Sequence, residues 1–264
     1  MKQAELFDVK GHIALVTGAA SGLGLAYAEV MAENGAKTVL TDIDRAGLER
    51  ETSRLRAAGC DVDQVVVDIA DTEALRAAID GTVARYGRLD AVFANAGISS
   101  GPGFGFTPEG GIVNVSREKW DEVVAINLTG NFTTMQAAAR HMKERRYGRI
   151  VVVASIAGLI SEPHVGYPYA ATKAAMINLV RHAAVEMAPE GVVVNGIAPG
   201  PFRTNLAGGK IADPEIAASF AEPIPMKRIA DVDEIKGLAL LLASPASSFL
   251  TGVTIPIDGG HTAL

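Results

Sequence analysis

Short hydrophobic runs rich in β-branched residues alternate along the chain with longer stretches in which apolar positions recur every three or four residues. The short runs are almost continuously apolar, as expected of strands that helices cover on both faces. Their alternation with helices predicts βαβ units around a parallel sheet. We therefore expect an α/β fold of three layers, with a doubly wound parallel sheet of about seven strands. The strands are predicted at Ile13–Thr17, Thr38–Asp42, Gln64–Val67, Ala91–Ala94, Ile150–Ser155, Val192–Ile197 and Thr254–Ile257.

Residues that favour helix ends bound the predicted helices. Asp71 and Ser116 are placed to cap the helices that follow them, and Asp231 with Glu234 has the spacing of a capping box. Glycine, asparagine or proline stands at the end of most of these stretches. The helices are predicted at Gly22–Asn34, Arg45–Ala58, Thr72–Tyr86, Arg117–Arg146, Tyr169–Met187, Pro214–Ala221 and Ile235–Leu242.

Two segments rich in glycine or proline interrupt this rhythm, and each follows a predicted strand. Residues 98–111 are rich in both, and residues 201–225 are irregular apart from one short helix. An open parallel sheet binds its ligands at the carboxyl ends of its strands. We predict one domain over residues 1–264, with these two segments as substrate loops.

Composition excludes several classes of partner. The net charge is -6, and the basic cluster Lys143–Arg149 is interpreted as the last turn of a helix, so no nucleic-acid partner is expected. The single cysteine, Cys60, fits a reducing compartment. The longest apolar run, Ile150–Ile160, is about half of a membrane span. These features predict a soluble cytoplasmic protein with no membrane partner.

A glycine-rich turn links the first strand to the first long helix. It contains Gly18, Gly22 and Gly24 among small residues, so the backbone can approach a pyrophosphate at the helix N-terminus. Asp42 ends the second strand, where a carboxylate can accept hydrogen bonds from both ribose hydroxyls. Together they predict a Rossmann dinucleotide site. A tight turn without a ligand, and Asp42 as a strand-end residue, remain the alternatives.

Tyr169 and Lys173 lie four residues apart on one predicted helix and form the candidate catalytic pair. A free tyrosine has a pKa of about 10 and is a poor base at neutral pH. We expect the lysine charge to lower the pKa of Tyr169, which could then exchange protons with a substrate. Ser155, at the end of the preceding strand, offers a hydroxyl to polarise the substrate oxygen. For the pair alone, a buried tyrosine beside a surface lysine is the alternative.

The order of these motifs resembles that of the short-chain dehydrogenase/reductase family. Gly18-x3-Gly22-x-Gly24 is similar to the family's glycine signature, Asn95-Ala96-Gly97 to its N-A-G turn, and Pro199-Gly200-x3-Thr204 to its nicotinamide-side segment. Tyr169-x3-Lys173 follows in the expected place, and the resemblance covers nearly the whole chain. It implies an NAD(P)-dependent oxidoreductase that acts on a CH–OH group.

The resemblance also implies roles for individual residues. Asp68 and Ile69 are expected at the adenine, and Asn127 is expected to anchor a water that links Lys173 to solvent; a polar surface residue is the alternative for Asn127. The implied catalytic residues are Asn127, Ser155, Tyr169 and Lys173. The implied cofactor-binding residues are Gly18, Ser21, Gly22, Leu23, Gly24, Asp42, Asp68, Ile69, Asn95, Gly97, Tyr169, Lys173, Pro199, Gly200 and Thr204.

The cofactor is predicted to be NAD rather than NADP. Asp42 would repel a 2′-phosphate, the glycine-rich turn has no basic residue, and Ile43 follows the acid. Three interpretations of function follow. The first is NAD-dependent oxidation of a secondary alcohol. The second is an NADPH-dependent ketone reductase of the 3-oxoacyl type, which Asp42 disfavours. The third is a cofactor-sensing protein without catalysis, which would not need the catalytic residues.

One spacing departs from the family pattern. Thirteen residues separate Ser155 from Tyr169, one more than is common in the family, so Tyr167 is a rival by distance. Ser155, Tyr167, His164 and Phe202 are the predicted substrate contacts, and secondary alcohols, polyols or sugars, and β-hydroxyacyl compounds all stay open as substrates. No His, Cys or Asp set has the spacing of metal ligands, so no metal is predicted. The family resemblance implies a homotetramer or homodimer.

Overall fold

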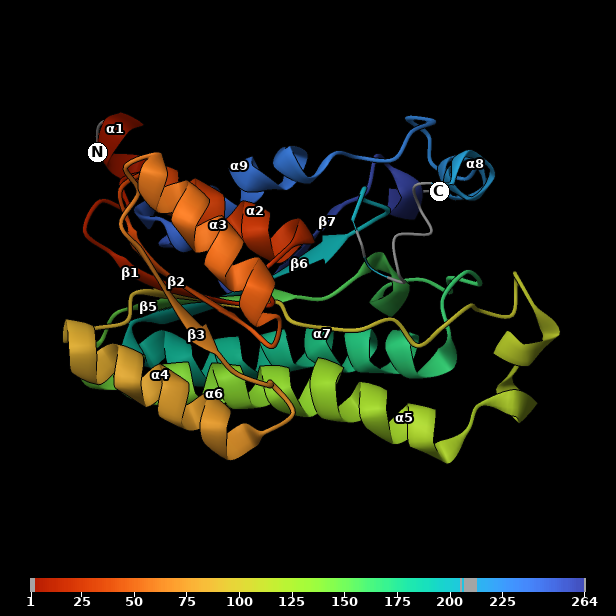
Figure 1. Cartoon of the computed structure of the whole chain (residues 1–264), viewed down its shortest axis with the longest axis horizontal. Coiled ribbons are helices and arrows are strands. Elements are labelled where there is room, and N and C mark those ends of the chain that lie inside the picture. The colour runs from red at the N-terminus through yellow and green to blue at the C-terminus, as the bar shows by residue number, and fades with distance from the viewer. Residues whose placement is uncertain (1–2, 205, 207–212, 264) are drawn as a thin grey trace.

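Seven parallel strands form one sheet in the order β3-β2-β1-β4-β5-β6-β7 in the computed structural model, which describes residues 3–204, 206 and 213–263 (Figure 1). The strand order up to β6 is that of a Rossmann sheet, and the predicted fold class is confirmed. All strands end at the same edge of the sheet, where ligands bind in this architecture. The strands are β1 (Ile13–Thr17), β2 (Lys37–Asp42), β3 (Val62–Val66), β4 (Ala91–Ala94), β5 (Gly148–Val153), β6 (Val192–Pro199) and β7 (Thr254–Ile257).

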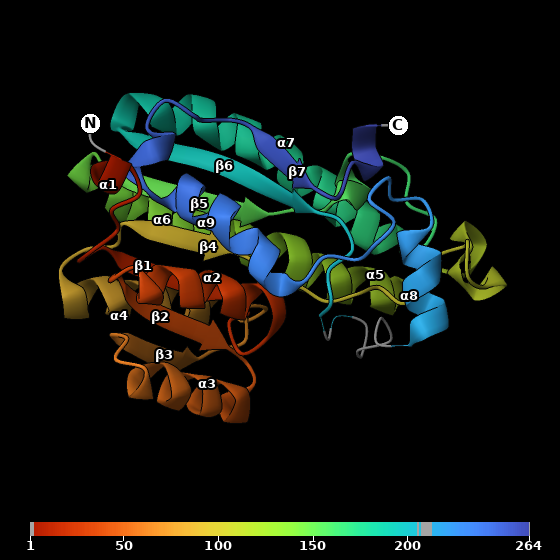
Figure 2. The same cartoon turned by 90° about the horizontal axis from the view of Figure 1, so that it is seen from above.

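Helices cover both faces of the sheet (Figure 2). One layer contains α2 (Gly22–Glu33), α3 (Arg45–Ala57) and α9 (Lys236–Ala243). The other contains α4 (Thr72–Tyr86), α6 (Asn131–Arg145) and α7 (Tyr167–Met187). None of the helices in the described part of the chain is long and apolar enough to cross a membrane. Three further helices are α1 (Gln3–Leu6), α5 (Arg117–Val123) and α8 (Pro214–Ala221).

The central strand β1 shows why the strand sequences are almost wholly apolar. Ala14 and Val16 pack into the core below α2 and α9, whereas Ile13 and Leu15 pack into the core below α4, α6 and α7. Because successive side chains point to opposite faces and both faces are covered, every residue of β1 is buried.

Two helices differ from their predicted form. The predicted helix Arg117–Arg146 contains a π-helical stretch, Val124–Gly130, between α5 and α6. The sequence predicts a helix that starts at Tyr169, whereas α7 starts two residues earlier, at Tyr167. Pro168 occupies the second helical position. A proline fits there since the N–H groups of the first turn have no partner within the helix.

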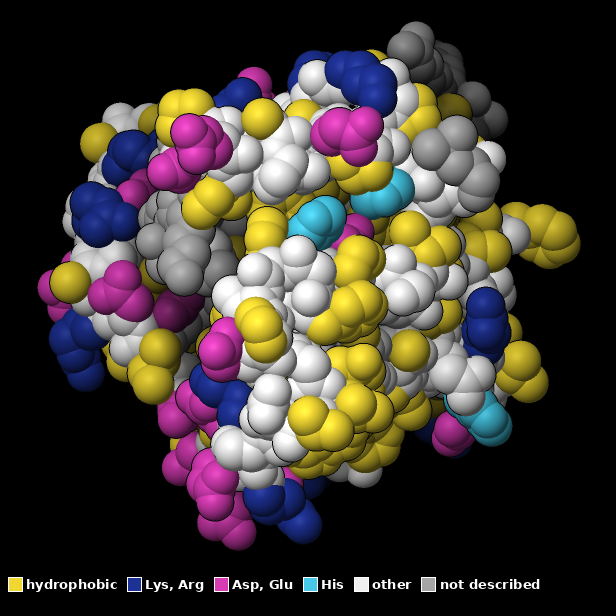
Figure 3. Space-filling model, turned by 90° about the vertical axis from the view of Figure 1, so that its right-hand side faces the viewer, with side chains coloured by type: hydrophobic (Ala, Val, Ile, Leu, Met, Phe, Trp, Pro, Cys, Tyr) yellow, Lys and Arg dark blue, Asp and Glu magenta, His cyan; other side chains and the backbone are white. Residues whose placement is uncertain are grey.

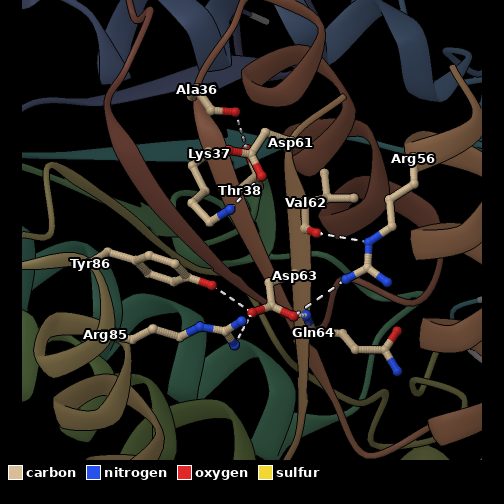
Figure 4. A network of polar contacts seen from close by, with 10 residues as sticks. All are labelled: Ala36, Lys37, Thr38, Arg56, Asp61, Val62, Asp63, Gln64, Arg85 and Tyr86. Carbon is tan, nitrogen blue, oxygen red and sulfur yellow. Dashed lines mark hydrogen bonds and ion pairs between the residues drawn. The ribbon is translucent and has the colours of Figure 1, made fainter. Parts of the chain in front are cut away.

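The edge strand β3, which forms the outer edge of the sheet beside β2, is lined with charged side chains (Figure 4). Asp63 on the edge strand β3 accepts hydrogen bonds from Arg56, Arg85 and the Tyr86 hydroxyl, and Lys37 pairs with Asp61. Burial raises the pKa of Tyr86 to about 12, and the bond to Asp63 acts in the same direction. Charged side chains along an edge strand oppose pairing with another chain.

Candidate active site

The glycine-rich turn after β1 allows a close backbone approach. Gly18 has φ of 69° and Gly22 has φ of 58°, a region that side chains disfavour. A methyl group at Gly18 would lie 2.9 Å from Cα of Ala96, and one at Gly24 would lie 2.0 Å from the Gly18 carbonyl oxygen. Within the described residues, the Ser21 side chain makes no capping hydrogen bond to α2. The first N–H groups of α2 can therefore receive a phosphate, so the turn fits a dinucleotide.

Asp42 is fixed on the rim of this turn. Its Oδ2 accepts a hydrogen bond of 3.0 Å from the N–H of Ala20, and its Oδ1 accepts one of 3.0 Å from the N–H of Asp44. The carboxylate is half-buried at the carboxyl end of β2. The neighbouring Leu23 packs against the apolar core. A fixed negative charge thus borders the turn.

The carboxyl end of β4 is tied to that of β1. The N–H of Asn95 donates to Oγ1 of Thr17 at 3.0 Å, and Nδ2 of Asn95 donates to the carbonyl oxygen of Thr17 at 2.8 Å. A methyl group at Gly97 would lie 3.2 Å from Oδ1 of Asn127. These contacts hold the predicted N-A-G turn beside the glycine-rich turn.

The turn after β3 lies next to the π-helical stretch. Ile69 is buried, and a methyl group at Gly130 would lie 2.5 Å from Cγ1 of Ile69. Asp68 is exposed and accepts a hydrogen bond of 2.9 Å from the N–H of Ala70. The two predicted adenine residues thus occupy the ligand-binding edge, one buried and one facing solvent.

Asn127 occupies the middle of the π-helical stretch and is fully buried, so its alternative as a surface residue is wrong. Oδ1 accepts a hydrogen bond of 2.8 Å from the N–H of Ile98, and Nδ2 donates one of 2.9 Å to the Ile98 carbonyl oxygen. π-Helical turns are often found at functional sites. The side chain of Asn127 thus fixes the start of the first substrate loop, and its role in holding a water stays a prediction.

Ser155, Tyr169 and Lys173 come together at the carboxyl end of β5. Ser155 Oγ accepts a hydrogen bond of 3.2 Å from the N–H of Ala157, and the serine hydroxyl lies beside Tyr169, where it acts to lower the pKa of the tyrosine. Lys173 Nζ lies 5.5 Å from the centre of the Tyr169 ring. Lys173 is 3% exposed, so the pair is not a buried tyrosine beside a surface lysine.

The pKa of Tyr169 differs from the sequence expectation. Burial raises it, and the hydrogen bond from Ser155 opposes that effect without overcoming it. Lys173 Nζ donates its hydrogen bond of 2.8 Å to the Val153 carbonyl oxygen, and burial lowers the pKa of this lysine to about 8. The lysine charge therefore does not by itself lower the tyrosine pKa in the protein.

Tyr167 lies apart from the Ser155 and Lys173 contacts. Its ring is 6.1 Å from that of Phe104 in the first substrate loop. It also lines a groove with Ile112 and Trp120, beside the N-terminal turn of α5. The contacts of Ser155 and Lys173 are thus with Tyr169, which favours Tyr169 over its rival as the reactive tyrosine.

The segment after β6 crosses toward the cofactor turn. Pro199 is the last residue of β6, and the N–H of Gly200 donates a hydrogen bond of 3.0 Å to the Ile257 carbonyl oxygen. A methyl group at Gly22 would lie 3.5 Å from the side chain of Thr204. The predicted nicotinamide segment therefore borders the glycine-rich turn. Residues 205 and 207–212 of the second substrate loop lie outside the described residues.

Two of the predicted substrate contacts, Phe202 and His164, lie in different surroundings: one in the apolar core and one at the ligand-binding edge. Phe202 is 4% exposed and belongs to the apolar core, so the structure gives it a packing role instead of the predicted substrate contact. His164 lies at the ligand-binding edge and pairs with Glu162. Sequence patterns missed His261 and Phe220, which join this pair from distant parts of the chain. Their sequence neighbours carry no motif that signals such a role.

A Rossmann sheet with a dinucleotide turn and a Ser–Tyr–Lys set at its carboxyl edge defines a nicotinamide-dependent oxidoreductase. Comparison with known proteins supports this class, because similar proteins are named dehydrogenases. Residues 18–262 match the family described as Enoyl-(Acyl carrier protein) reductase. The chain is 35% identical to gluconate 5-dehydrogenase of Gluconobacter oxydans, with 99% of each protein covered. It is 37% identical to cis-4-hydroxycyclohexanecarboxylate dehydrogenase of Sinomonas cyclohexanicum, over 96% of this chain and 97% of that protein.

A solved structure shows the same fold. The chain matches a gluconate 5-dehydrogenase from Burkholderia cenocepacia in complex with NADP and tartrate, with a TM-score of 0.91, 35% identity and 100% of both chains covered. The chain belongs to the short-chain dehydrogenase/reductase family. It is an NAD(P)-dependent oxidoreductase that acts on alcohol or ketone substrates.

Proposed function

We propose that the protein oxidises a secondary alcohol to a ketone with NAD, using Ser155, Tyr169 and Lys173. The observation that carries this proposal is the contact of Tyr169 with both a serine hydroxyl and a buried lysine at the ligand-binding edge. Oxidation removes a proton from the alcohol oxygen and a hydride from its carbon. NAD, when bound, accepts the hydride.

The protein side chains then handle the oxygen and its proton. Ser155 donates a hydrogen bond to the substrate oxygen and orients it toward Tyr169. Tyr169 takes the proton in oxidation and returns it in reduction. Because burial raises the pKa of Tyr169, oxidation depends on charges that stabilise its phenolate. Lys173 would supply one of these charges, and the oxidised nicotinamide, when bound, would supply the other. Asn127 fixes the loop beside the site and would anchor a water that links Lys173 to solvent.

The residues that would hold the cofactor follow the edge of the sheet. Glycine at positions 18 and 24 lets the turn pack closely against Ala96 and against its own backbone, which shapes the turn that would hold the pyrophosphate. Asp42 would border the adenosine ribose. Ser21, Gly22 and Leu23 stand at the start of α2. The remaining proposed contacts are Asp68, Ile69, Asn95, Gly97, Pro199, Gly200 and Thr204.

Preference for NAD over NADP is part of this proposal. It rests on the fixed carboxylate of Asp42, which would face a 2′-phosphate with like charge. The similar gluconate 5-dehydrogenase from Burkholderia cenocepacia was solved with NADP, so family membership alone does not decide the cofactor. An NADPH-dependent 3-oxoacyl-type reductase is the second candidate, and Asp42 disfavours it.

We also propose a dimer or tetramer. Phe132 on α6 is 44% exposed and Trp120 on α5 is 38% exposed, next to the groove against α7. Phe249, which precedes β7, is fully exposed. Apolar surface on the long helices and near the last strand fits association through these two regions. Native mass spectrometry tests this, and a monomer at micromolar concentration would contradict it.

A panel of alcohols and ketones assayed with each cofactor tests the function. The proposal predicts reduction of NAD by at least one secondary alcohol, with a higher kcat/KM than for NADP. Activity only with NADPH and 3-oxoacyl substrates would support the second candidate. Cofactor binding without turnover of any compound would instead favour a sensing role.

A further inference from the structure

A buried carboxylate lies between two imidazoles at the ligand-binding edge. The Glu162 side chain is 7% exposed, and its Oε1 accepts hydrogen bonds from the N–H of His164 at 3.1 Å and from Nδ1 of His164 at 2.8 Å. Its Oε2 lies 4.0 Å from Nε2 of His261, which is beyond hydrogen-bond distance. Figure 3 shows two histidine side chains beside an acidic one on this face of the molecule.

Four segments that follow different strands build this cluster. The His164 ring packs 4.7 Å from the ring of Phe106 in the first substrate loop and 5.1 Å from that of Phe220 on α8. The N–H of Gly103 donates a hydrogen bond of 3.1 Å to the His164 carbonyl oxygen, which fastens the first loop to the Glu162 segment. The position of the cluster thus depends on the tertiary fold.

The turn that carries His261 is also fixed. Asp258 accepts hydrogen bonds from the N–H of Gly260 at 2.9 Å, from the N–H of Thr262 at 2.8 Å and from the Thr262 hydroxyl at 2.7 Å. These bonds close a turn around His261. The imidazole is therefore held beside Glu162 from the far end of the chain.

Two members of the cluster, Glu162 and His164, lie on the loop that joins Ser155 to Tyr169. The Ser155 hydroxyl lies beside Tyr169, so the thirteen residues between them form a loop whose two ends meet at the reacting centre. Glu162 is seven residues from either end of this loop. Glu162 therefore belongs to the segment that directly joins two residues of the reacting centre.

Two polar groups of the cluster retain hydrogen-bonding capacity. Among the described residues, Nδ1 of His261 is buried and has no hydrogen-bond partner. Oε2 of Glu162 is an acceptor beyond hydrogen-bond reach of His261. The ring nitrogen of His261 nearest to Oε2 is Nε2, and with the imidazole proton on Nε2 a carboxylate acceptor and an imidazole donor stand side by side. A hydroxyl group both donates and accepts, and it matches this arrangement.

We infer that Glu162 and His261 bind a second hydroxyl group of the substrate, which makes the substrate a diol or polyol. This inference rests on the proposed function, because it concerns the alcohol that Tyr169 deprotonates. A carboxylate in the same place would face the charge of Glu162 in a largely buried setting, where like charges repel strongly. The subsite therefore selects a neutral hydroxyl over an anion.

A matched set of ring alcohols tests the inference. The positional isomers of cyclohexanediol are compared with cyclohexanol and with hydroxycyclohexanecarboxylate, and kcat/KM is measured with NAD and with NADP. At least one diol should exceed cyclohexanol by about tenfold or more, the value of a hydrogen bond to a charged group. Glu162→Gln and His261→Phe should each abolish most of this gain. Glu162→Gln should also raise the rate on the carboxylate relative to the diol.

Controls separate this inference from the proposed function. Glu144→Gln makes the same change at an exposed position on α6 and should leave the ratio of diol to cyclohexanol as in wild type. The Kd for NADH reports whether each variant is folded. The inference is overturned if cyclohexanol is oxidised but no diol exceeds it, or if the gain survives in both variants. If no alcohol is oxidised with either cofactor, the proposed function itself fails.

Discussion

Lys173 Nζ donates a hydrogen bond of 2.8 Å to the Val153 carbonyl oxygen, on the last residue of β5. This bond places a nearly fully buried amine under the catalytic tyrosine, 5.5 Å from the centre of its ring. Burial lowers the pKa of Lys173 to about 8. The residue that is proposed to assist Tyr169 therefore carries its charge at a cost to the stability of the fold.

This cost predicts a pH-dependent effect of Lys173→Met on stability. In wild type the pKa of Lys173 is about 8 in the folded state and 10.5 in the unfolded chain. The unfolded chain binds more protons between these values, so wild-type stability rises with pH across this range, and the full cost, ~3 kcal/mol, applies below pH 8. The variant avoids that cost but loses the bond to Val153, worth about 1 kcal/mol.

The variant should therefore have a higher free energy of unfolding near neutral pH, by about 2 kcal/mol, and the difference should shrink toward pH 10.5. Urea denaturation at the two ends of this range measures it. A variant less stable than wild type near neutral pH would show that the buried charge does not destabilise the fold.

Asp42→Asn is expected to change the choice of cofactor. The amide keeps an acceptor oxygen for the N–H of Ala20 but removes the charge that opposes a 2′-phosphate. The ratio of kcat/KM for NAD to that for NADP should fall by about tenfold or more, which corresponds to about 1.4 kcal/mol. Asp61→Asn removes the same charge at the outer edge of the sheet and should leave the ratio unchanged. If Asp42→Asn and Asp61→Asn have the same ratio of kcat/KM for NAD to that for NADP, Asp42 does not determine the cofactor preference.

Asn127→Ala should destabilise the protein and loosen the first substrate loop. It leaves the N–H and carbonyl oxygen of Ile98 without their partners, at a cost of about 2 kcal/mol or more. Hydrogen exchange at the Ile98 amide should accelerate more than exchange in β1. Asn114 follows this loop, and Asn114→Ala removes an exposed bond to Pro108 within the loop, which should cost less than about 1 kcal/mol. Unchanged protection at Ile98 would show that Asn127 does not hold the loop.

The sequence predicted the inner strands well because they are buried on both faces and therefore almost wholly apolar, as β1 shows, whereas the edge strand β3 carries Asp63 and Gln64. The π-helical stretch could not be predicted, because it accompanies hydrogen bonds between Asn127 and Ile98, 29 residues apart. The direction of the Tyr169 pKa was also missed, since the depth of burial is a property of the packed protein.

The substrate side was the least predictable part of the site. Phe202 was expected to face the substrate because it follows a strand, but its ring packs into the core. Glu162 and His164 are near neighbours in sequence, whereas His261 reaches them only through the turn after β7. Contacts between such distant segments follow from the fold and have no local pattern.

The catalytic role of Tyr169 is the central claim, and paired substitution of the two tyrosines tests it most directly. Tyr169→Phe removes the hydroxyl that meets Ser155, whereas Tyr167→Phe removes one that borders the groove near Phe104. On any alcohol that the wild type oxidises, Tyr169→Phe should lower kcat by about a thousandfold with little change in the Kd for NADH, as expected for loss of a general acid/base. Tyr167→Phe should change kcat by less than about tenfold. Near-normal kcat in Tyr169→Phe, or its loss in Tyr167→Phe alone, would contradict the account.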